Sequence, residues 1–221
     1  MPPATTPDEP AVAAYGPDIP TEADLRLLGD VKGKRVLDLG CGDGAAAVAF
    51  ALAGATVVGV DPSADALAAA RARAEGAEVR LERRSGDVAD LAFLRADSID
   101  GVFAAGSLAA VDDLGRVFRQ VHRVLKVGAP LAFSLPHPAW GALTAGRSWF
   151  DRSPLRDAEG AVVALPRPLS DLYATLVRAS YRVDALLEPE PVPHAPRSAG
   201  WDPRMAAVPR TLVVRARKEG S

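Results

Sequence analysis

The chain has 221 residues and a mass of 23.0 kDa, and its 26 Lys and Arg residues against 28 Asp and Glu residues give a formal net charge of −2. With 48% hydrophobic and 24% charged residues the chain has the composition of a folded protein, which excludes collagen-like, fibrous and natively unfolded classes. The near-neutral balance argues against a protein that mainly grips nucleic acid, because such proteins carry clustered Lys and Arg and a high pI.

The N-terminus and the cysteine content predict a cytoplasmic protein. Asp8 and Glu9 stand where a secretory signal carries Lys or Arg, and no apolar segment follows them. The single cysteine, Cys41, cannot form an intramolecular disulfide, which suits a reducing compartment. The longest uncharged run, 17 residues from Gly44 to Val60, is interrupted by Gly54 and is predicted as helix, turn and strand rather than a membrane span.

Prolines divide the chain into regions. Six lie in the first 20 residues, twelve lie beyond residue 129, and Pro62 stands alone between them. Residues 1–12 are polar and rich in proline, so we expect a flexible tail there. Residues 13–221 contain no linker that would split them, so they are expected to form a single domain.

The middle of the chain alternates short apolar runs with helical stretches, which is the pattern of βαβ units that build a parallel sheet. Strands are expected at residues 35–39, 55–60, 78–82, 99–104 and 130–135. Helices are expected at residues 45–53, at 64–76 after Ser63 as N-cap, and from a cap at Asp112 or Asp113 to Leu125. Beyond Pro136 the pattern predicts a loop-rich stretch, a helix at 170–179, and strands at 181–187 and 210–216 around a proline-rich excursion.

The segment from Gly40 to Gly44 follows the first strand and precedes a helix. In a doubly wound sheet this loop lies where ligands bind, and its glycines let the backbone approach a ligand closely. Asp61 ends the second strand, where an acidic side chain can accept hydrogen bonds from both hydroxyls of a ribose. Together these features predict a nucleoside-bearing cofactor but do not choose which one, since the loop also loosely fits a dinucleotide fingerprint.

Five segments of the chain stand in a characteristic order: VLDLGCGDG (36–44), VVGVDPS (57–63), GDVADL (86–91), DSIDGVFAAGSL (97–108) and RVLKVGAPL (123–131). In this order and spacing they resemble the class I, Rossmann-like, S-adenosylmethionine-dependent methyltransferases of the small, single-domain type. The resemblance implies an α/β fold, a three-layer αβα sandwich with a seven-stranded, mostly parallel sheet and an antiparallel last strand. It also implies S-adenosyl-L-methionine as cofactor and no metal.

The resemblance assigns cofactor contacts position by position. Asp38 and the backbone of Gly40, Cys41 and Gly42 would hold the methionine end of the cofactor, and Asp61 would hold the ribose diol. For Asp61 the alternative is an ordinary cap at the end of a strand. For Cys41 the alternative, a small packing residue, is favoured over a nucleophile because no base partner is recognisable.

The same resemblance places the adenine side of the cofactor. Pro62 and Ser63 would form the edge of the adenine pocket, Asp87 would accept a hydrogen bond from the adenine amino group, and Val88 would lie against the ring. Ala104 would line the floor beneath the sulfonium.

Aromatic residues and one histidine are candidates for the acceptor side. Tyr15 matches an aromatic that such enzymes often fold over the methyl group, and His137 follows the fifth strand at the functional edge of the sheet, as a catalytic base or substrate contact. The alternative for His137 is a loop histidine that holds the backbone. Trp140, Trp149 and Phe150 are expected either to wall an acceptor pocket or to lie in the core.

The leading functional hypothesis is methyl transfer from S-adenosylmethionine to a nucleophilic atom of a small-molecule acceptor by in-line displacement. The slightly negative charge and the lack of a nucleic-acid methylase motif argue against a nucleic-acid substrate, and no membrane contact is expected. The alternatives are an NAD(P)-dependent Rossmann oxidoreductase and a non-catalytic, regulatory domain that binds S-adenosylmethionine. The acceptor, the methylated atom and the oligomeric state are not indicated.

Overall fold

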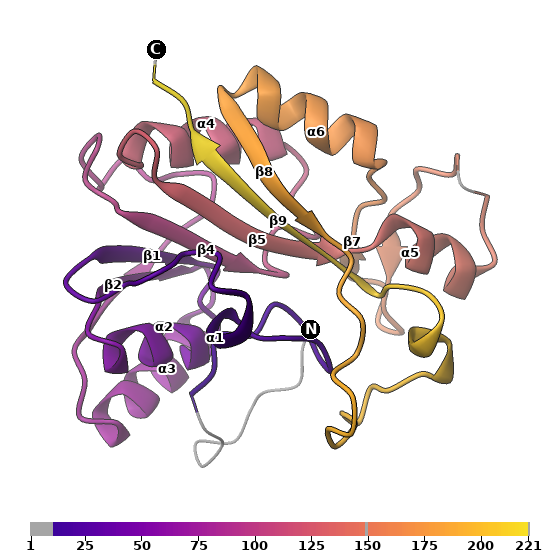
Figure 1. Cartoon of the computed structure of the whole chain (residues 1–221), viewed down its shortest axis with the longest axis horizontal. Helices are drawn as coiled ribbons and strands as arrows, with labels where there is room; N and C mark the ends of the chain where they lie inside the picture. Colours follow the sequence, from indigo (N-terminus) through magenta and orange to yellow (C-terminus); the bar gives the residue numbers. More distant parts are fainter. Residues whose placement is uncertain (1–10, 149, 221) are drawn as a thin grey trace.

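The computed structural model describes residues 11–148 and 150–220, and over these residues the chain forms a seven-stranded sheet with helices on both faces (Figure 1). The strand order is β3-β2-β1-β4-β5-β9-β8. These strands are β1 (Arg35–Leu39), β2 (Thr56–Asp61), β3 (Leu81–Ser85), β4 (Gly101–Ala105), β5 (Pro130–Pro136), β8 (Tyr181–Leu187) and β9 (Thr211–Lys218). β9 runs antiparallel to β5 and β8, while the pairs among β1 to β5 are parallel, which confirms the predicted sheet.

The helices form the outer layers of the sandwich. One face of the sheet carries α1 (Glu22–Leu25), α2 (Ala45–Leu52) and α3 (Ala64–Gly76), and the other carries α4 (Leu114–Val124) and α6 (Leu169–Arg178), as Figure 1 shows. Further elements lie beyond the carboxyl ends of β5 and β8: α5 (Pro138–Ala145), the hairpin of β6 (Leu155–Arg156) and β7 (Val162–Ala164), and the 3-10 helix η1 (Pro203–Ala206). We call α5, this hairpin and residues 189–209 the cap.

Apolar side chains on both faces of the parallel strands form two core clusters. On the α4 and α6 face, the Phe118 ring lies 5.6 Å from Phe133, centroid to centroid. On the α1 and α2 face, the Phe103 ring lies 5.0 Å from Tyr15 and 5.3 Å from Phe50. The core therefore holds β1, β4 and β5 from both sides, so that their carboxyl ends have fixed positions.

The boundary between α3 and β3 differs from the sequence prediction, which began this strand at Glu78. In the structure Glu78 has a positive φ of 54°, and the N–H of Val79 donates to the carbonyl of Ala74. Residues 77–79 thus close the helix, with Glu78 in the left-handed position that a glycine usually takes. The strand starts only at Leu81.

The region after Pro136 contains more regular structure than predicted. His137 caps α5 and Pro138 occupies its first turn, a position where proline is favoured because its missing N–H is not needed. The sequence prediction treated these prolines as loop signals. Of the expected flexible tail, residues 1–10 lie outside the described residues, as does Trp149. No helix within the described part of the chain is long and apolar enough to cross a membrane.

Candidate functional site

The glycine loop after β1 (residues 40–44) is hydrogen-bonded to the end of β2 and packs closely against Ser107 and Ala70. The N–H groups of Gly40 and Cys41 both donate to the carbonyl of Val60, at 2.7 and 3.0 Å. A Cβ on Gly40 would lie 2.2 Å from the Cβ of Ser107, and one on Gly44 would lie 2.8 Å from the Cβ of Ala70. Both glycines also have positive φ, so a side chain at either position would clash and strain the backbone. Gly42 differs from both, because a Cβ there would contact nothing within 4 Å, so the space beside it is open.

Asp61, at the end of β2, is oriented by two backbone donors. Its Oδ2 accepts the N–H of Gly42 at 2.9 Å, and its Oδ1 accepts the N–H of Ser63 at 2.9 Å. Each carboxylate oxygen retains lone-pair capacity, because an oxygen of an ionised carboxylate accepts about two hydrogen bonds. The half-buried Asp61 can therefore bind two neighbouring hydroxyls while it fixes the glycine loop.

Asp38, on β1 beneath the loop, is a buried acid that lacks a partner on one side. Its side chain is 2% exposed, and its Oδ2 has no hydrogen-bond partner among the described residues. Burial, with a smaller effect of the Asp61 and Asp43 carboxylates, raises the pKa of Asp38 to about 7, although the N–H of Ala47 donates to it. An unpaired buried carboxyl group is costly, so this position favours a cationic ligand group.

The side chain of Cys41 packs against Gly59 of β2. Its side chain is buried, and its Sγ lies 2.9 Å from where a Cβ on Gly59 would be. Burial and, next, the Asp38 carboxylate raise the pKa of the thiol well above its usual range, which keeps it protonated. This environment favours the packing role that the sequence analysis preferred.

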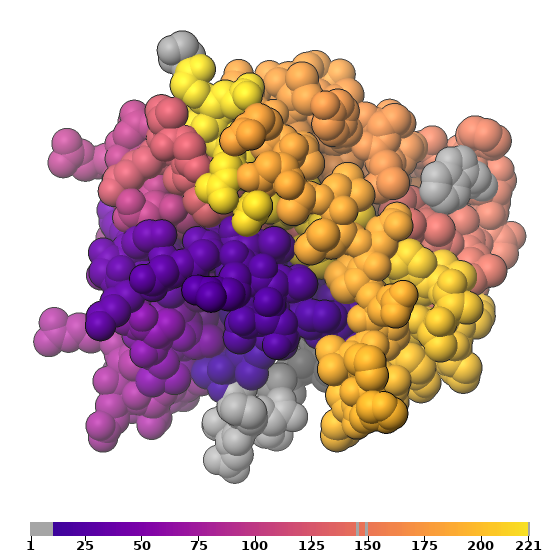
Figure 2. Space-filling model, viewed as in Figure 1, coloured from indigo at the N-terminus to yellow at the C-terminus, as the bar shows by residue number. Residues whose placement is uncertain are grey.

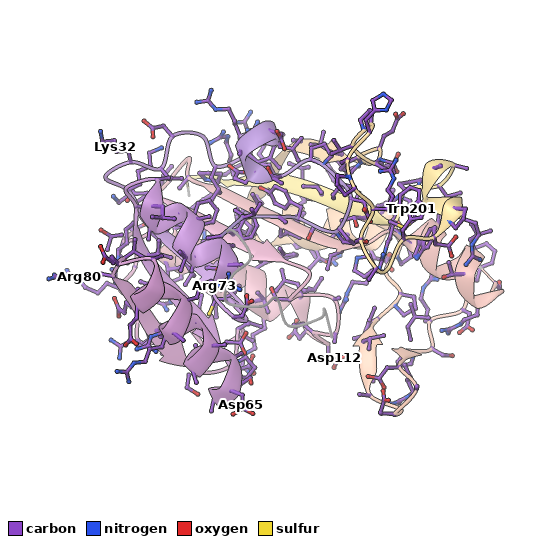
Figure 3. All side chains as sticks on the ribbon, turned by 90° about the horizontal axis from the view of Figure 1, so that it is seen from below. Lys32, Asp65, Arg73, Arg80, Asp112 and Trp201 are labelled. Atoms are coloured by element: carbon purple, nitrogen blue, oxygen red, sulfur yellow. The ribbon has the colours of Figure 1, made fainter. Side chains whose placement is uncertain are left out.

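A buried ion pair that the sequence analysis did not identify ties the loop to α3. The Nη2 of Arg73 lies 2.8 Å from the Oδ2 of Asp43, and its Nε donates to the carbonyl of Asp43 at 3.3 Å. The Asp43 Oδ1 in turn accepts the N–H of Ala45 in the first turn of α2. Figure 3 shows Arg73 directed inward from α3, whereas Asp65 and Arg80 lie at the periphery.

The residues assigned to the adenine side lie at the ends of β2 and β3. Ser63 caps α3, since its Oγ accepts the N–H of Ala66 at 3.2 Å, and Pro62 beside it is exposed. Asp87 is exposed, and its Oδ1 accepts the N–H of Ala89 at 2.8 Å, while Val88 is buried next to it. The structure therefore gathers these four residues with Asp61 along one edge of the sheet.

Two assigned residues lie within the core. Ala104 is fully buried in the cluster on the α4 face, and the next residue, Ala105, is the half-buried one. Tyr15 is 2% exposed, and its hydroxyl donates to the Oε2 of Glu22 at 2.6 Å. The carbonyl of Tyr15 accepts the Oγ of Ser134 on β5 at 2.6 Å, so the residue anchors the N-terminal segment to the sheet.

Glu22 completes this anchor and was not singled out from the sequence. Its carboxylate also accepts the N–H groups of Leu27 and Leu28, at 3.0 and 2.7 Å. Burial raises the pKa of Glu22, while the hydrogen bond from Tyr15 opposes that shift. Moving Tyr15 over a ligand would break these contacts.

His137 uses both of its ring nitrogens within the protein. Its Nδ1 accepts the N–H of Ala139 at 3.1 Å, so the neutral ring carries its proton on Nε2. That Nε2 lies 2.9 Å from the Oε1 of Glu188, to which it donates. Because both ring nitrogens are in hydrogen bonds within the protein, the geometry favours the alternative role of holding the backbone.

A cavity of about 50 Å³ lies beyond the end of β5, between the sheet and the cap. Its walls are mainly aliphatic and include Leu135, Leu155 and Leu212, together with the ring of His137. Trp140 and Phe150 are not among its lining residues, and Phe150 is 80% exposed. Over the described residues, no three His, Cys, Asp or Glu side chains are grouped to hold a metal ion.

Comparisons with known proteins agree with this geometry. Residues 37–133 match the family model described as a methyltransferase domain. An S-adenosylmethionine-dependent methyltransferase from Mesorhizobium loti is 28% identical, with a TM-score of 0.67 over 88% of this chain and 95% of that one. Another from Methanosarcina mazei is 21% identical, with a TM-score of 0.69 over 89% and 97% of the two chains. No curated protein sequence gives a significant match.

The methyltransferase-domain match over residues 37–133, the sheet order and the solved structures are consistent with a class I, Rossmann-like, S-adenosylmethionine-dependent methyltransferase. The domain match and these neighbours support a methyltransferase with S-adenosylmethionine as its cofactor, and they argue against the oxidoreductase alternative. The orphaned carboxyl oxygen of Asp38, the open side of Gly42 and the oriented carboxylate of Asp61 fit a ligand with an ammonium group and a ribose.

Proposed function

We propose that the protein transfers a methyl group to a nucleophilic atom of a small-molecule acceptor by in-line displacement. The observation that carries this proposal is the narrow cavity at the end of β5, whose walls include residues of α5 and of the β6–β7 hairpin as well as of the sheet. A cavity of about 50 Å³ admits a small group and excludes a folded macromolecule. The cofactor, when bound, supplies a methyl group already activated by the sulfonium.

In this proposal the residues at the ends of β1 and β2 bind the cofactor. Asp38 would pair with the ammonium group, and the backbone at Gly40, Cys41 and Gly42 would lie along the methionine end. Asp61 would accept the two ribose hydroxyls, since the N–H groups of Gly42 and Ser63 hold its two carboxylate oxygens in place.

The other residues assigned from the sequence would border the adenine or support the strand ends. Pro62, Ser63, Asp87 and Val88 would border the adenine, because they follow β2 and β3 on the same edge. Tyr15 and Ala104 would act from within the core, by fixing the ends of β4 and β5.

The cap would exclude water and orient the acceptor. It is tied to the N-terminal segment, where Asp18 accepts the N–H and Oγ of Ser198 at 2.7 and 2.6 Å. Figure 2 shows the N-terminal segment beside the residue 189–209 segment on one face of the molecule. We assign His137 a positioning role, joining β5, α5 and Glu188.

Two measurements test this proposal. Calorimetric titration with S-adenosylhomocysteine, S-adenosylmethionine and NADH should show binding of the two adenosyl ligands alone. Transfer of labelled methyl to a library of small molecules, with tRNA and protein extract as controls, should label small molecules. Labelling of RNA or protein alone would refute a small-molecule acceptor.

A further inference from the structure

The cavity beyond β5 has an unusual combination of walls. Its aliphatic lining comes from the sheet, the hairpin and α6, through Leu135, Leu155, Ala164 and Leu172. Its charged lining, in the described part of the chain, comprises three arginines, Arg147, Arg152 and Arg167, against one acid, Asp151. The excess of guanidinium groups is local, because the whole chain has a net charge of −2.

The single acid is already occupied. The Nε of Arg147 lies 2.7 Å from the Oδ2 of Asp151, and the other oxygen, Oδ1, accepts the N–H and Oγ of Ser153. These contacts account for the pKa of Asp151, which lies well below its usual range, chiefly because of Arg147. Asp151 therefore balances Arg147 and does not compensate the charge of Arg167.

Arg167, unlike Arg147, contacts no carboxylate among the described residues. Its guanidinium donates to the carbonyls of Ala109, at 3.0 Å, and of Val111, both of which are neutral acceptors. No carboxylate of the described residues lies within ion-pair distance of it, and Asp112 acts on it only through space. Burial lowers the pKa of Arg167, which reflects the cost of desolvating its charge.

A half-buried cation at the wall of an apolar cavity is stabilised by an anion that enters the cavity, and a guanidinium suits the planar geometry of a carboxylate. Phosphate is larger and more strongly hydrated, so the narrow cavity favours the carboxylate.

We propose that the methyl acceptor is a small monocarboxylate whose carboxylate pairs with Arg167 while its apolar part fills the aliphatic cavity. This inference rests on the proposed small-molecule function and names the class of that substrate. The lining also includes Leu135 and Pro136, so an acceptor in this cavity lies beside the end of β5.

The test compares carboxylates with neutral amides of the same shape. Propionate, benzoate and phenylacetate are titrated against the protein with S-adenosylhomocysteine present, and so are propionamide, benzamide and phenylacetamide. At least one carboxylate should bind more than about tenfold tighter than its amide, the preference expected for hydrogen bonds to a charged group. Equal binding within every pair, or no binding of any carboxylate at millimolar concentration, would overturn the inference.

Variants test whether Arg167 causes the preference for a carboxylate over its amide. Arg167→Met should abolish this preference, and Arg167→Lys should retain part of it. Arg156→Met, on β6 of the neighbouring hairpin but outside the cavity lining, should leave the preference unchanged. Should Arg167→Met fail to fold, Arg167→Gln, whose amide N–H groups can still donate to a backbone carbonyl, should likewise abolish the preference. Full preference in Arg167→Met or Arg167→Gln contradicts the assignment. If the wild-type protein does not bind S-adenosylhomocysteine, the proposed function itself is refuted. This result therefore distinguishes a failure of the proposed function from a failure of the carboxylate proposal alone.

Discussion

Replacing Arg73 by methionine tests whether the buried ion pair prepares the glycine loop for the cofactor. The side chains of Arg73 and Asp43 are 6% and 23% exposed, so methionine removes their ion pair from a largely buried place. Removal of one partner from a fully buried pair costs about 3–5 kcal/mol, and the partial exposure of Asp43 reduces this to about 2 kcal/mol of folding stability.

The effect on binding follows from the loop. Without Arg73, the backbone at Asp43 loses a side-chain anchor and must be ordered when the cofactor binds, at about 1–2 kcal/mol for each residue. We therefore expect about tenfold weaker binding of S-adenosylhomocysteine by calorimetry. Arg73→Lys should bind with intermediate affinity, because it keeps the charge without the two-point contact.

A matched control lies on the same helix. Arg71 pairs with Glu75 at 2.6 Å, but both side chains are 64% exposed, so Arg71→Met should change neither stability nor affinity measurably. Thermal unfolding and calorimetry of both variants separate the two effects. Wild-type affinity in Arg73→Met, with only its melting temperature lowered, would refute the idea that the pair prepares the loop.

Three further predictions concern the cofactor and the cap. Because the pKa of Asp38 is raised to about 7, the free protein gains stability from its protonated form at low pH and loses it as the pH rises through about 7. Affinity for S-adenosylmethionine should rise with pH up to about 7 and then level off, and a profile equally steep in Asp38→Asn would exclude this group. Asp61→Ala should weaken S-adenosylhomocysteine binding by about 1 kcal/mol or more, as measured by calorimetry, and unchanged affinity would remove it from the ribose site. His137→Asn keeps an N-cap acceptor, so turnover should persist once an acceptor is known, whereas its abolition with intact cofactor affinity would restore the catalytic role.

Much of the central sheet could be predicted because its strands are buried on both faces and read as apolar runs. The bounds of β1 and β8 agree with the prediction residue for residue, and the start of β3 fails because Glu78 takes a position typical of glycine. The cap could not be predicted in detail, since its prolines serve as helix starts as well as loop residues.

In the candidate site, residues within short motifs could be predicted from the sequence, whereas contacts between distant residues could not. Asp38, Asp61 and the glycines lie within short motifs that a sequence displays directly. Arg73 and Asp43 are 30 residues apart, and Arg167 meets the carbonyl of Ala109 58 residues away. No local pattern marks such pairs, because only the folded sheet and helices bring them together.

The position of β9 in the sheet has a consequence for the synthesis of the protein. β9 (Thr211–Lys218) follows all the other strands in the chain, yet it lies between β5 and β8 and pairs with both. During translation β8 has no neighbour to pair with until residues 211–218 have left the ribosome. The half of the sheet that supports the cap therefore assembles last, while β1 to β4 and the glycine loop can form earlier. A nascent chain stopped before residue 211 should expose the edges of β5 and β8 and depend on chaperones to avoid aggregation.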